Sequence, residues 1–562
     1  GLDTVPEKKA RAYFIETGGL FSLKQNRVYS PDKFDRSLRN LRDELHRTGF
    51  QEATVSAAHL ERDDRTGVVK TSIQVNQGPR FFVHSVRLEV SFENTNAPVS
   101  VSTNWPGDPY SQWWEQDYAL SIKTNFYRLG YPDTSVEVQT LARDPQTNEV
   151  RLDLRAIVQT GPFVRVGNIG FTGNKHTKTN VLERRIPLHE GELLNRIKAE
   201  RGRYRLSRLG VFDSVELSYE NVDEHTRNLL YHLEEAKRIE VSLLFGYGSY
   251  ELLRGGVQLD QYDVFGLAHR QQLKLTQSFK SSSADYLYTL PEFFGEDVDL
   301  FINASGLRRQ EISFLRLEYG GGAGLRKFFR NVNTDMSVRY NYQILEADGG
   351  PTNLFRRSAQ NSGVGAIITD LNHDRRDNPL YPHHGYRVYG NVELASEYLA
   401  SDVNYQRLDL SLSYHAPVSD SQWIHFGLSH GLVATLGSRN ADLPFNRRFF
   451  PGGENSVRGY QQGEAAPRDA EGKIVGAETY LQGNVEFEQG LTPKFSLVVF
   501  VDGVGFAREL KNYPFDQALF SAGGGIQWKT IIGPVRLEYG YNLNPRPRDP
   551  VGTLHFSLGF PF

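Results

Sequence analysis

The stretch "HGYRVYGNVELAS", residues 384–396, decides the fold class of the second half of this chain. Apolar or small residues occupy every second position, and polar residues such as Arg387, Asn391 and Glu393 stand between them. Successive side chains of a strand point to opposite faces. One face of this strand would carry Tyr386, Val388, Gly390, Val392 and Leu394. The alternation predicts a β-strand with one apolar and one polar face.

The same alternation recurs as far as the C-terminus, in "RIEVSLLFGYGSY" (238–250), "QRLDLSLSYHAPV" (406–418) and "GTLHFSLGFPF" (552–562). A strand that crosses an outer membrane needs about 9–11 residues, and with its turn or loop it takes about 20. The 325 residues from 238 to 562 are therefore enough for about 16 strands. This segment predicts a transmembrane antiparallel β-barrel.

Composition favours a membrane barrel over a soluble β-protein. Gly (52), Tyr (28) and Phe (34) are abundant, and a polar lumen is consistent with the mean hydropathy of −0.48. A soluble β-sandwich or propeller is the alternative, but blade repeats are absent and the chain ends on the aromatic Phe562. No run of about 18 apolar residues occurs, which excludes a transmembrane helix.

Other classes of function are disfavoured by charge and residue usage. The net charge of −3 gives no reason to expect a nucleic-acid partner. The absence of cysteine removes disulfides, thiolate zinc sites and Cys nucleophiles. We find no nucleophile elbow, phosphate loop or HExxH motif, so we expect neither an enzyme nor a cofactor. The chain starts at Gly1 without a signal peptide, which is typical of a mature or trimmed product.

The first 237 residues contain an internal repeat. An amphipathic helix leads into a glycine break at Gly49, Gly130 and Gly210, with spacings of 81 and 80 residues. A second marker recurs in phase at Gly78 and Gly161. Alternating strands follow each break, so each repeat is expected to be a small α+β domain. We predict three such domains followed by the barrel, at residues 1–82, 83–163, 164–237 and 238–562.

The repeats resemble POTRA domains, the periplasmic modules of outer-membrane assembly proteins. The third repeat, with "VGNIGFTGNKHTKTNVLERRI" (166–186) and "LGVFDSVEL" (209–217), carries the resemblance best. The first repeat is weaker at its start, where "ARAYFIE" (10–16) is expected to form an incomplete opening strand.

A loop between two late strands reads "RRFFPGGENSVRGYQQG" (447–463). It resembles loop six of the BamA/TamA outer-membrane insertase superfamily. The matching motif residues are Val457, Arg458, Gly459 and Tyr460, preceded by Phe449, Phe450, Gly452 and Gly453. In that family the loop folds into the barrel lumen and its arginine meets acidic residues on the inner wall. The resemblance implies that Arg458 binds Glu486 or Asp502; the alternative is an exposed Arg-Gly turn that binds nothing.

A second cluster, "DLNHDRRDNPLYPHHGYRV" (370–388), also matches a turn of this superfamily. It is dense in potential metal ligands, namely His373, Asp374, Asp377, His383 and His384. These residues flank two prolines rather than lying on one helix face or on two facing strands, which disfavours a metal site. We expect a tight turn in which Asp side chains cap backbone amides.

The first and last barrel strands must pair to close the barrel, and we predict a weak seam there. Glycines add entropy to a strand and offer no cross-strand packing. Alternatively, the seam glycines Gly246, Gly248 and Gly559 only accommodate packing against neighbouring parts of the chain. The predicted seam residues are Leu243, Phe245, Gly246, Gly248, Phe556, Leu558, Gly559 and Phe562.

The resemblance covers nearly the whole chain and implies a superfamily member closest to TamA, in a Gram-negative outer membrane with its POTRA domains in the periplasm. Three repeats and a short loop six suggest TamA rather than BamA. The implied partners are the lipid bilayer, a TamB-like periplasm-spanning protein and unfolded outer-membrane clients such as autotransporters, with a link to lipid transport. The alternatives are a BamA-type general insertase, a two-partner secretion transporter and a porin.

Overall fold

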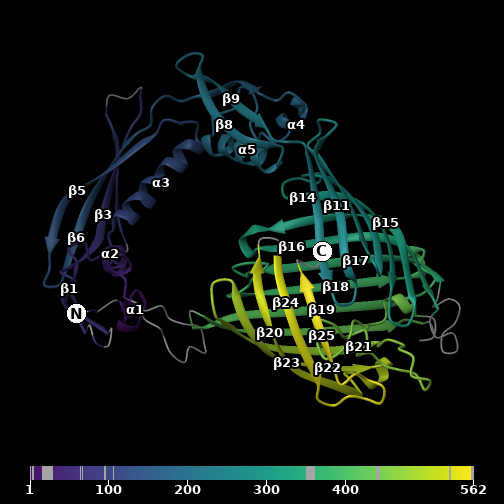
Figure 1. The fold of residues 1–562 in the computed structure, drawn as a ribbon. Helices are drawn as coiled ribbons and strands as arrows, with labels where there is room; N and C mark the ends of the chain where they lie inside the picture. Colours follow the sequence, from purple (N-terminus) through teal and green to yellow (C-terminus); the bar gives the residue numbers. More distant parts are fainter. Residues whose placement is uncertain are drawn as a thin grey trace. The chain divides into compact units, whose positions relative to one another are not determined.

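The computed structural model describes residues 2, 5–14, 29–63, 65, 68–93, 97–105, 107–349, 361–419, 421–437, 443–530 and 533–558. The chain divides into an N-terminal unit that ends at Ala236 and a barrel unit that runs from Lys237. Figure 1 draws the first in purple to blue and the second in teal to yellow.

The N-terminal unit holds three successive groups of helices and strands. The first contains α1 (Glu7–Ala12), α2 (Pro31–Arg47), β1 (Thr54–Arg62) and β2 (Val69–Asn76). The second contains β3 (Arg80–Ser91), β4 (Val99–Asn104), α3 (Gln112–Arg128), β5 (Ser135–Pro145) and β6 (Glu149–Gln159). The third contains β7 (Arg165–Thr172), α4 (Thr179–Glu183), α5 (Arg196–Arg208), β8 (Phe212–Asn221) and β9 (Thr226–Glu235).

The three groups are variations on one plan. The third has two helices between its first and second strands and a sheet of order β7-β9-β8. The second keeps only α3, and β4 takes the place of the other helix, giving a sheet of order β4-β3-β6-β5. In the first, β1 and β2 form a two-stranded sheet.

The prediction of an opening strand at residues 10–16 is wrong over its described part. Ala10 to Ala12 belong to α1, and residues 15 and 16 lie outside the described residues. Acidic Glu7 and basic Arg11 stand at the helix ends that suit their charges. Ala10 is buried against α2, where Leu41 and Leu45 belong to the same core. This tertiary contact favours a helix over the expected strand.

The glycine breaks end the helices as predicted. Gly49, Gly130 and Gly210 follow α2, α3 and α5, and all three have positive φ, at 105°, 92° and 67°. Residues other than glycine rarely adopt a positive φ, which explains why glycine stands at each break. Ser30 occupies the N-cap position before α2 with extended backbone, but its side chain makes no capping hydrogen bond.

Glu235, at the end of β9, holds the segment before α4. Its carboxylate accepts hydrogen bonds from the backbone N–H groups of His176 (2.8 Å) and Thr177 (2.9 Å), and it lies 2.8 Å from His176 Nδ1. Burial by itself raises the pKa of Glu235, but these hydrogen bonds outweigh it and lower the pKa from 4.5 to about 2.

This lowered pKa predicts a pH-dependent contribution to local stability. The contribution is complete above the unfolded-state pKa, near 4.3, and is lost as the pH falls through about 2. We expect Glu235→Gln to lower the free energy of local opening at residues 173–183 by about 1–2 kcal/mol at pH 7. At pH 3 this loss of opening free energy should shrink to less than about half of its value at pH 7.

Hydrogen exchange of the whole chain at both pH values measures the opening free energy, with the exposed Glu220→Gln as control. An equal loss at both pH values would contradict the stabilising role of the ionised Glu235 carboxylate.

The barrel is closed and antiparallel, with the 16 strands that the sequence predicts. They are β10 (Ile239–Gly248), β11 (Leu252–Val264), β12 (His269–Ser278), β13 (Ser281–Leu290), β14 (Val298–Gln310), β15 (Leu315–Phe329), β16 (Thr334–Asp348), β17 (Asn361–Asp374), β18 (Gly385–Ala395), β19 (Tyr405–Ser419), β20 (Gln422–Thr435), β21 (Thr479–Gly490), β22 (Phe495–Ala507), β23 (Gln517–Thr530), β24 (Gly533–Asn542) and β25 (Gly552–Leu558).

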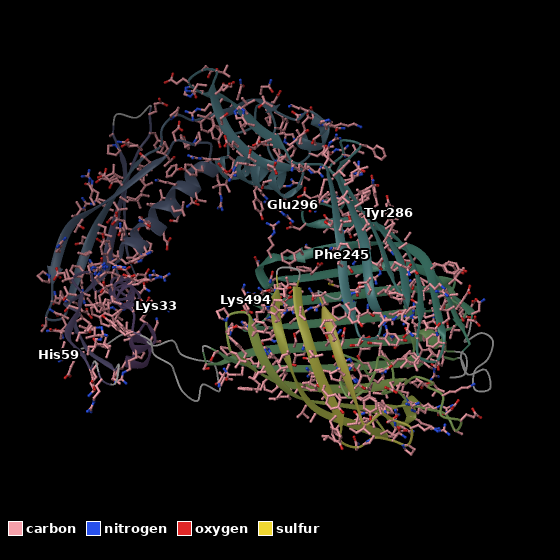
Figure 2. All side chains as sticks on the ribbon, viewed as in Figure 1. Lys33, His59, Phe245, Tyr286, Glu296 and Lys494 are labelled. Carbon is pink, nitrogen blue, oxygen red and sulfur yellow. The ribbon has the colours of Figure 1, made fainter. Side chains whose placement is uncertain are left out.

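The barrel strands separate an apolar outer face from a mixed inner face. On β22, Val499 and Val501 are exposed, whereas Phe500 and Asp502, which alternate with them, are buried inside. Figure 2 marks two further outer residues, Phe245 on β10 and Tyr286 on β13. Exposed apolar side chains all round a closed barrel match a lipid solvent. Within the described residues, none of the helices is both long and apolar enough to span a bilayer.

Candidate functional site

The loop between β20 and β21, called loop six here, enters the barrel and is mostly buried over residues 443–478, whereas Ala470, Glu471 and Lys473 at its turn are exposed. It opens with the short 3-10 helix η4 (Phe445–Arg447). Val457 and Tyr460 are fully buried and belong to one core with inward residues of the wall, among them Val433 and Phe506. The loop therefore packs as part of the barrel interior.

Arg458 is fastened to three carboxylates. Its Nε and Nη2 donate to the two oxygens of Asp502 at 2.9 and 2.8 Å, and its backbone N–H donates to Asp502 at 3.0 Å. Nη1 donates to Glu486 and lies 3.5 Å from Glu538. The guanidinium also covers the ring of Phe500. A planar fork suits such bidentate binding, which a lysine could not reproduce.

The structure brings Arg458 together with both of the acids singled out from the sequence, rather than with one of them. Asp502 takes the fork and has no exposed side-chain surface. Glu486 on β21 and Glu538 on β24 flank the same guanidinium. Glu538 was missed, because nothing in "RLEYGYN" (536–542) distinguishes it from other polar residues of an alternating strand.

Close approach of loop six to the wall depends on glycines on both sides. A Cβ on Gly459 would stand 2.8 Å from Ser521 Cβ and would overlap the Asn542 side chain. A Cβ on Gly540, in β24, would stand 2.6 Å from the Gly459 amide nitrogen and overlap the backbone of Arg458. Gly540 thus belongs to the site, although its sequence context did not indicate it.

We expect Gly540→Ala to displace the motif from the wall. Overpacking of this kind costs about 1–3 kcal/mol, so the temperature at which the folded barrel loses its compact electrophoretic mobility should fall. Gly306→Ala is the matched control, since a Cβ on Gly306 in β14 meets nothing within 4 Å. Equal melting of the two variants would contradict a close packing role for Gly540.

Tyr460 joins loop six to the hairpin that connects β24 and β25. Its hydroxyl donates to Asp549 at 3.2 Å, and the same carboxylate accepts from Arg468 at 3.0 Å and from Arg546 at 2.9 Å. Arg546 also donates to the backbone oxygen of Ala466 at 2.8 Å. The part of loop six from Tyr460 to Arg468 is therefore bound to the chain that leads into β25.

The chain turns inside the barrel at four residues upstream of the motif, Phe449, Phe450, Gly452 and Gly453. Phe449 packs against Tyr480, with ring centroids 5.0 Å apart, and Phe450 packs against Phe445 at 5.4 Å. Gly452 and Gly453 have φ of 121° and 107°. A Cβ at either glycine would stand 2.6 Å from atoms of the segment 461–462, so both positions require glycine.

The seam between β10 and β25 is short in the described residues. Only Tyr247 with Leu558 and Gly248 with Ser557 pair across it, whereas β10 and β11 pair at ten positions. Ser249 extends the seam through its side chain, which accepts from the Phe556 N–H at 2.5 Å and donates to the Phe556 oxygen at 3.1 Å. Among the described residues, few main-chain hydrogen bonds therefore oppose separation of the two strands.

The predicted seam residues divide into three groups. Leu243 and Phe245 point outward, with 67% and 71% of their surface exposed. Phe556 packs against Tyr247, with ring centroids 5.4 Å apart. A Cβ on Gly246 would stand 2.6 Å from Arg254 Nε, and one on Gly248 would stand 3.6 Å from Glu454 of loop six. Gly246 thus accommodates neighbouring chain, whereas a side chain at Gly248 would make only an ordinary van der Waals contact.

Gly559 and Phe562, the two remaining seam residues of the prediction, lie outside the described residues.

The turn at residues 374–385 is held by its aspartates. Asp377 Oδ1 accepts from the backbone N–H groups of Asn378, His383 and His384 at 2.9–3.0 Å. Asp374 pairs with Arg376 at 2.7 Å. No group of three or more His, Asp or Glu that could hold a metal ion occurs among the residues placed by the structure.

Comparison with known proteins places this geometry in a family. Residues 263–562 match the Omp85 superfamily domain. The match covers more than half of the chain and contains loop six from end to end. This chain belongs to the Omp85 superfamily. Residues 16–78 and 164–236 match a POTRA family described as a surface antigen variable number repeat, which covers the first and third repeats.

The relatives extend the similarity over nearly the whole chain. The outer membrane protein assembly factor BamA of Neisseria meningitidis is 21% identical over 99% of this chain and 76% of its own. BamA of Neorickettsia risticii is 24% identical over 95% of this chain and 73% of its own. Neither is a TamA protein, so these relatives do not support the expected closeness to TamA.

A solved structure supports the fold. BamA from Haemophilus ducreyi lacking POTRA domains 1–3 superposes with a TM-score of 0.63 over 81% of this chain and 94% of that chain, at 19% identity. The chain is thus an outer-membrane protein with a closed 16-stranded barrel and periplasmic POTRA domains, as the sequence indicated.

Proposed function

We propose that this protein inserts outer-membrane β-barrel proteins into the bilayer through its seam. The seam carries this proposal, because β10 and β25 have two pairs within the described residues, and a strand that parts from its neighbour exposes a row of unpaired backbone groups. An incoming client strand satisfies those groups by β-augmentation. The process needs no chemical step and no cofactor, so the protein is not an enzyme in this proposal.

Loop six has a supporting part in the proposal. Because it packs inside the lumen and is bound to the wall at Arg458, the barrel can keep its shape while the seam opens. The outward Leu243 and Phe245 would face lipid beside the seam, where a client strand must enter. The POTRA edges would receive extended client segments before that step.

We favour a general insertase of the BamA type over a TamA-like one, since the relatives described above are BamA proteins. The TamA reading rested on the number of repeats and on the length of loop six. The relatives continue beyond the matched region, so the number of repeats does not separate the two. Co-purification from cells decides between them: lipoprotein partners support the BamA type, and a TamB-like protein supports the other.

Reconstitution tests insertion directly. The purified protein in lipid vesicles should speed the folding of an added, urea-unfolded outer-membrane barrel at least about tenfold over empty vesicles. Vesicles with an equal amount of an unrelated barrel without POTRA domains are the control. A rate no higher than that control would reject the proposal.

Electrical recording separates an insertase from a porin or secretion channel. A barrel whose lumen is filled by loop six should show small and infrequent openings in planar bilayers. A large, stable pore in the unmodified protein would instead favour a transport function.

A further inference from the structure

Loop six carries a second arginine, Arg447, whose partners lie on another part of the wall. Its Nε donates to Glu393 at 2.9 Å and to the Tyr405 hydroxyl at 3.1 Å. Its Nη2 donates to Gln343 at 2.8 Å, and its Nη1 lies 3.3 Å from Glu318. The side chain is 7% exposed, so this is a buried and multiply bonded anchor.

The neighbours of Arg447 attach the same stretch to the same strands. The Asn446 side chain donates to the backbone oxygens of Leu317 and Glu346, both at 3.2 Å. Phe445 packs against Phe314 with ring centroids 4.6 Å apart. All three residues of η4 are therefore fixed to β15, β16 and the strands that follow.

Arg447 stands on the wall opposite the seam. Its partners lie on β15, β16, β18 and β19, and β17 between them is eight strands from β25 in a ring of 16, the largest separation possible. The carboxylates around Arg458 lie on β21, β22 and β24, nearer the seam. The twelve residues from Arg447 to Arg458 therefore cross the lumen.

The Arg458 end of this crossing also holds the seam strand. Thr553 Oγ1 donates to the Gly459 oxygen at 2.8 Å, and His555 Nε2 donates to the Arg458 oxygen at 3.0 Å. Both donors lie on β25. The motif thus bonds to the last strand from inside, where β25 has only two pairs with β10 among the described residues.

We propose that loop six is a transverse tie that holds the seam closed, and that Arg447 is the residue that anchors this tie on the far wall. With Arg447 in place, the segment that carries Arg458 and Gly459 cannot move away from the far wall. Strand β25 stays bonded to this segment. Without Arg447, Glu393 and Glu318 lose their shared cation, and the motif that bonds to β25 from inside loses its attachment to the far wall. This inference concerns the resting barrel; only its bearing on insertion rests on the proposed function.

Disulfide formation across the seam measures its closure without any client. The chain has no cysteine, so Tyr247→Cys with Leu558→Cys is a clean reporter. Under a mild oxidant, Arg447→Gln should slow the formation of this disulfide about fivefold or more, which is roughly what one hydrogen bond is worth. Thr553→Val, which cuts the other end of the tie at the seam strand, should slow it as well.

Two controls separate a tie from general loosening. Arg339→Gln removes a lumenal ion pair with Asp370, between neighbouring wall strands and away from loop six, and should leave the rate unchanged. A second reporter, Tyr288→Cys with Ile302→Cys across β13 and β14, should be unaffected in every background.

An unchanged seam rate in folded Arg447→Gln would overturn the proposal, and so would an equal slowing in Arg339→Gln. If Arg447→Gln does not fold, Thr553→Val decides in the same way. Because no client is present, these outcomes are independent of whether the protein proves to be an insertase.

Discussion

Client insertion should fall at least about tenfold when the seam is locked by a disulfide between Tyr247→Cys and Leu558→Cys. These residues face each other across β10 and β25 in one of only two described pairs. A disulfide needs Cα atoms about 4.4–6.8 Å apart, which directly paired strand residues satisfy. The lock would deny a client strand the free edge of β10, so insertion should stop while the barrel itself stays folded.

The measurement is the client-folding rate in vesicles before and after reduction. Reduction should restore the rate, which shows that the barrel was not damaged by the two substitutions. The disulfide between Tyr288→Cys and Ile302→Cys, within the wall, is the matched control and should leave insertion unchanged. Undiminished insertion with the seam lock confirmed by gel mobility would argue against lateral entry.

Arg458→Ala should have the largest effect on stability of the single substitutions described here. It leaves Asp502 without its cation in a closed interior, whereas Glu486 and Glu538 keep Arg536 nearby. Removing one partner of a buried ion pair costs about 3–5 kcal/mol, since the remaining charge is stranded. We expect a marked drop in the melting temperature of the folded band, together with reduced folding efficiency and complementation.

The origin of that loss can be tested by a second substitution. Adding Asp502→Ala to Arg458→Ala should return part of the stability, because one stranded charge is removed. Arg326→Ala is the control: its partner Asp335 is also in the barrel, but the Arg326 side chain is 56% exposed, and such pairs contribute about 0–1 kcal/mol. Full complementation and normal melting of Arg458→Ala would refute the anchoring role.

Local sequence signals were reliable wherever the structure depends on near neighbours. The alternation in residues 384–396 predicted β18 because inner and outer faces follow directly from the pleat. The three glycine breaks predicted helix ends because a positive φ is a property of one residue. By contrast, residues 10–14 were predicted wrongly, because their helix is stabilised by packing of Ala10 against α2.

The candidate site was predictable only in part. Resemblance pointed to Arg458 and to two acidic residues, and the structure places both acids against it. Arg447, Glu538, Gly540 and Asp549 were not singled out. Their roles depend on which strands face one another across the lumen, and residues 100 or more positions apart in the chain meet there.

Period and turn chemistry are encoded locally, so the sequence alone implies three small α+β repeats and a membrane barrel. How that barrel is held depends on its tertiary structure. Closure of a 16-stranded ring brings β17 opposite β25 and leaves β10 and β25 with two described pairs. Loop six spans that ring because Arg447 binds strands on both sides of β17, and the backbone at Arg458 and Gly459 bonds to β25. No local pattern specifies such distant partners.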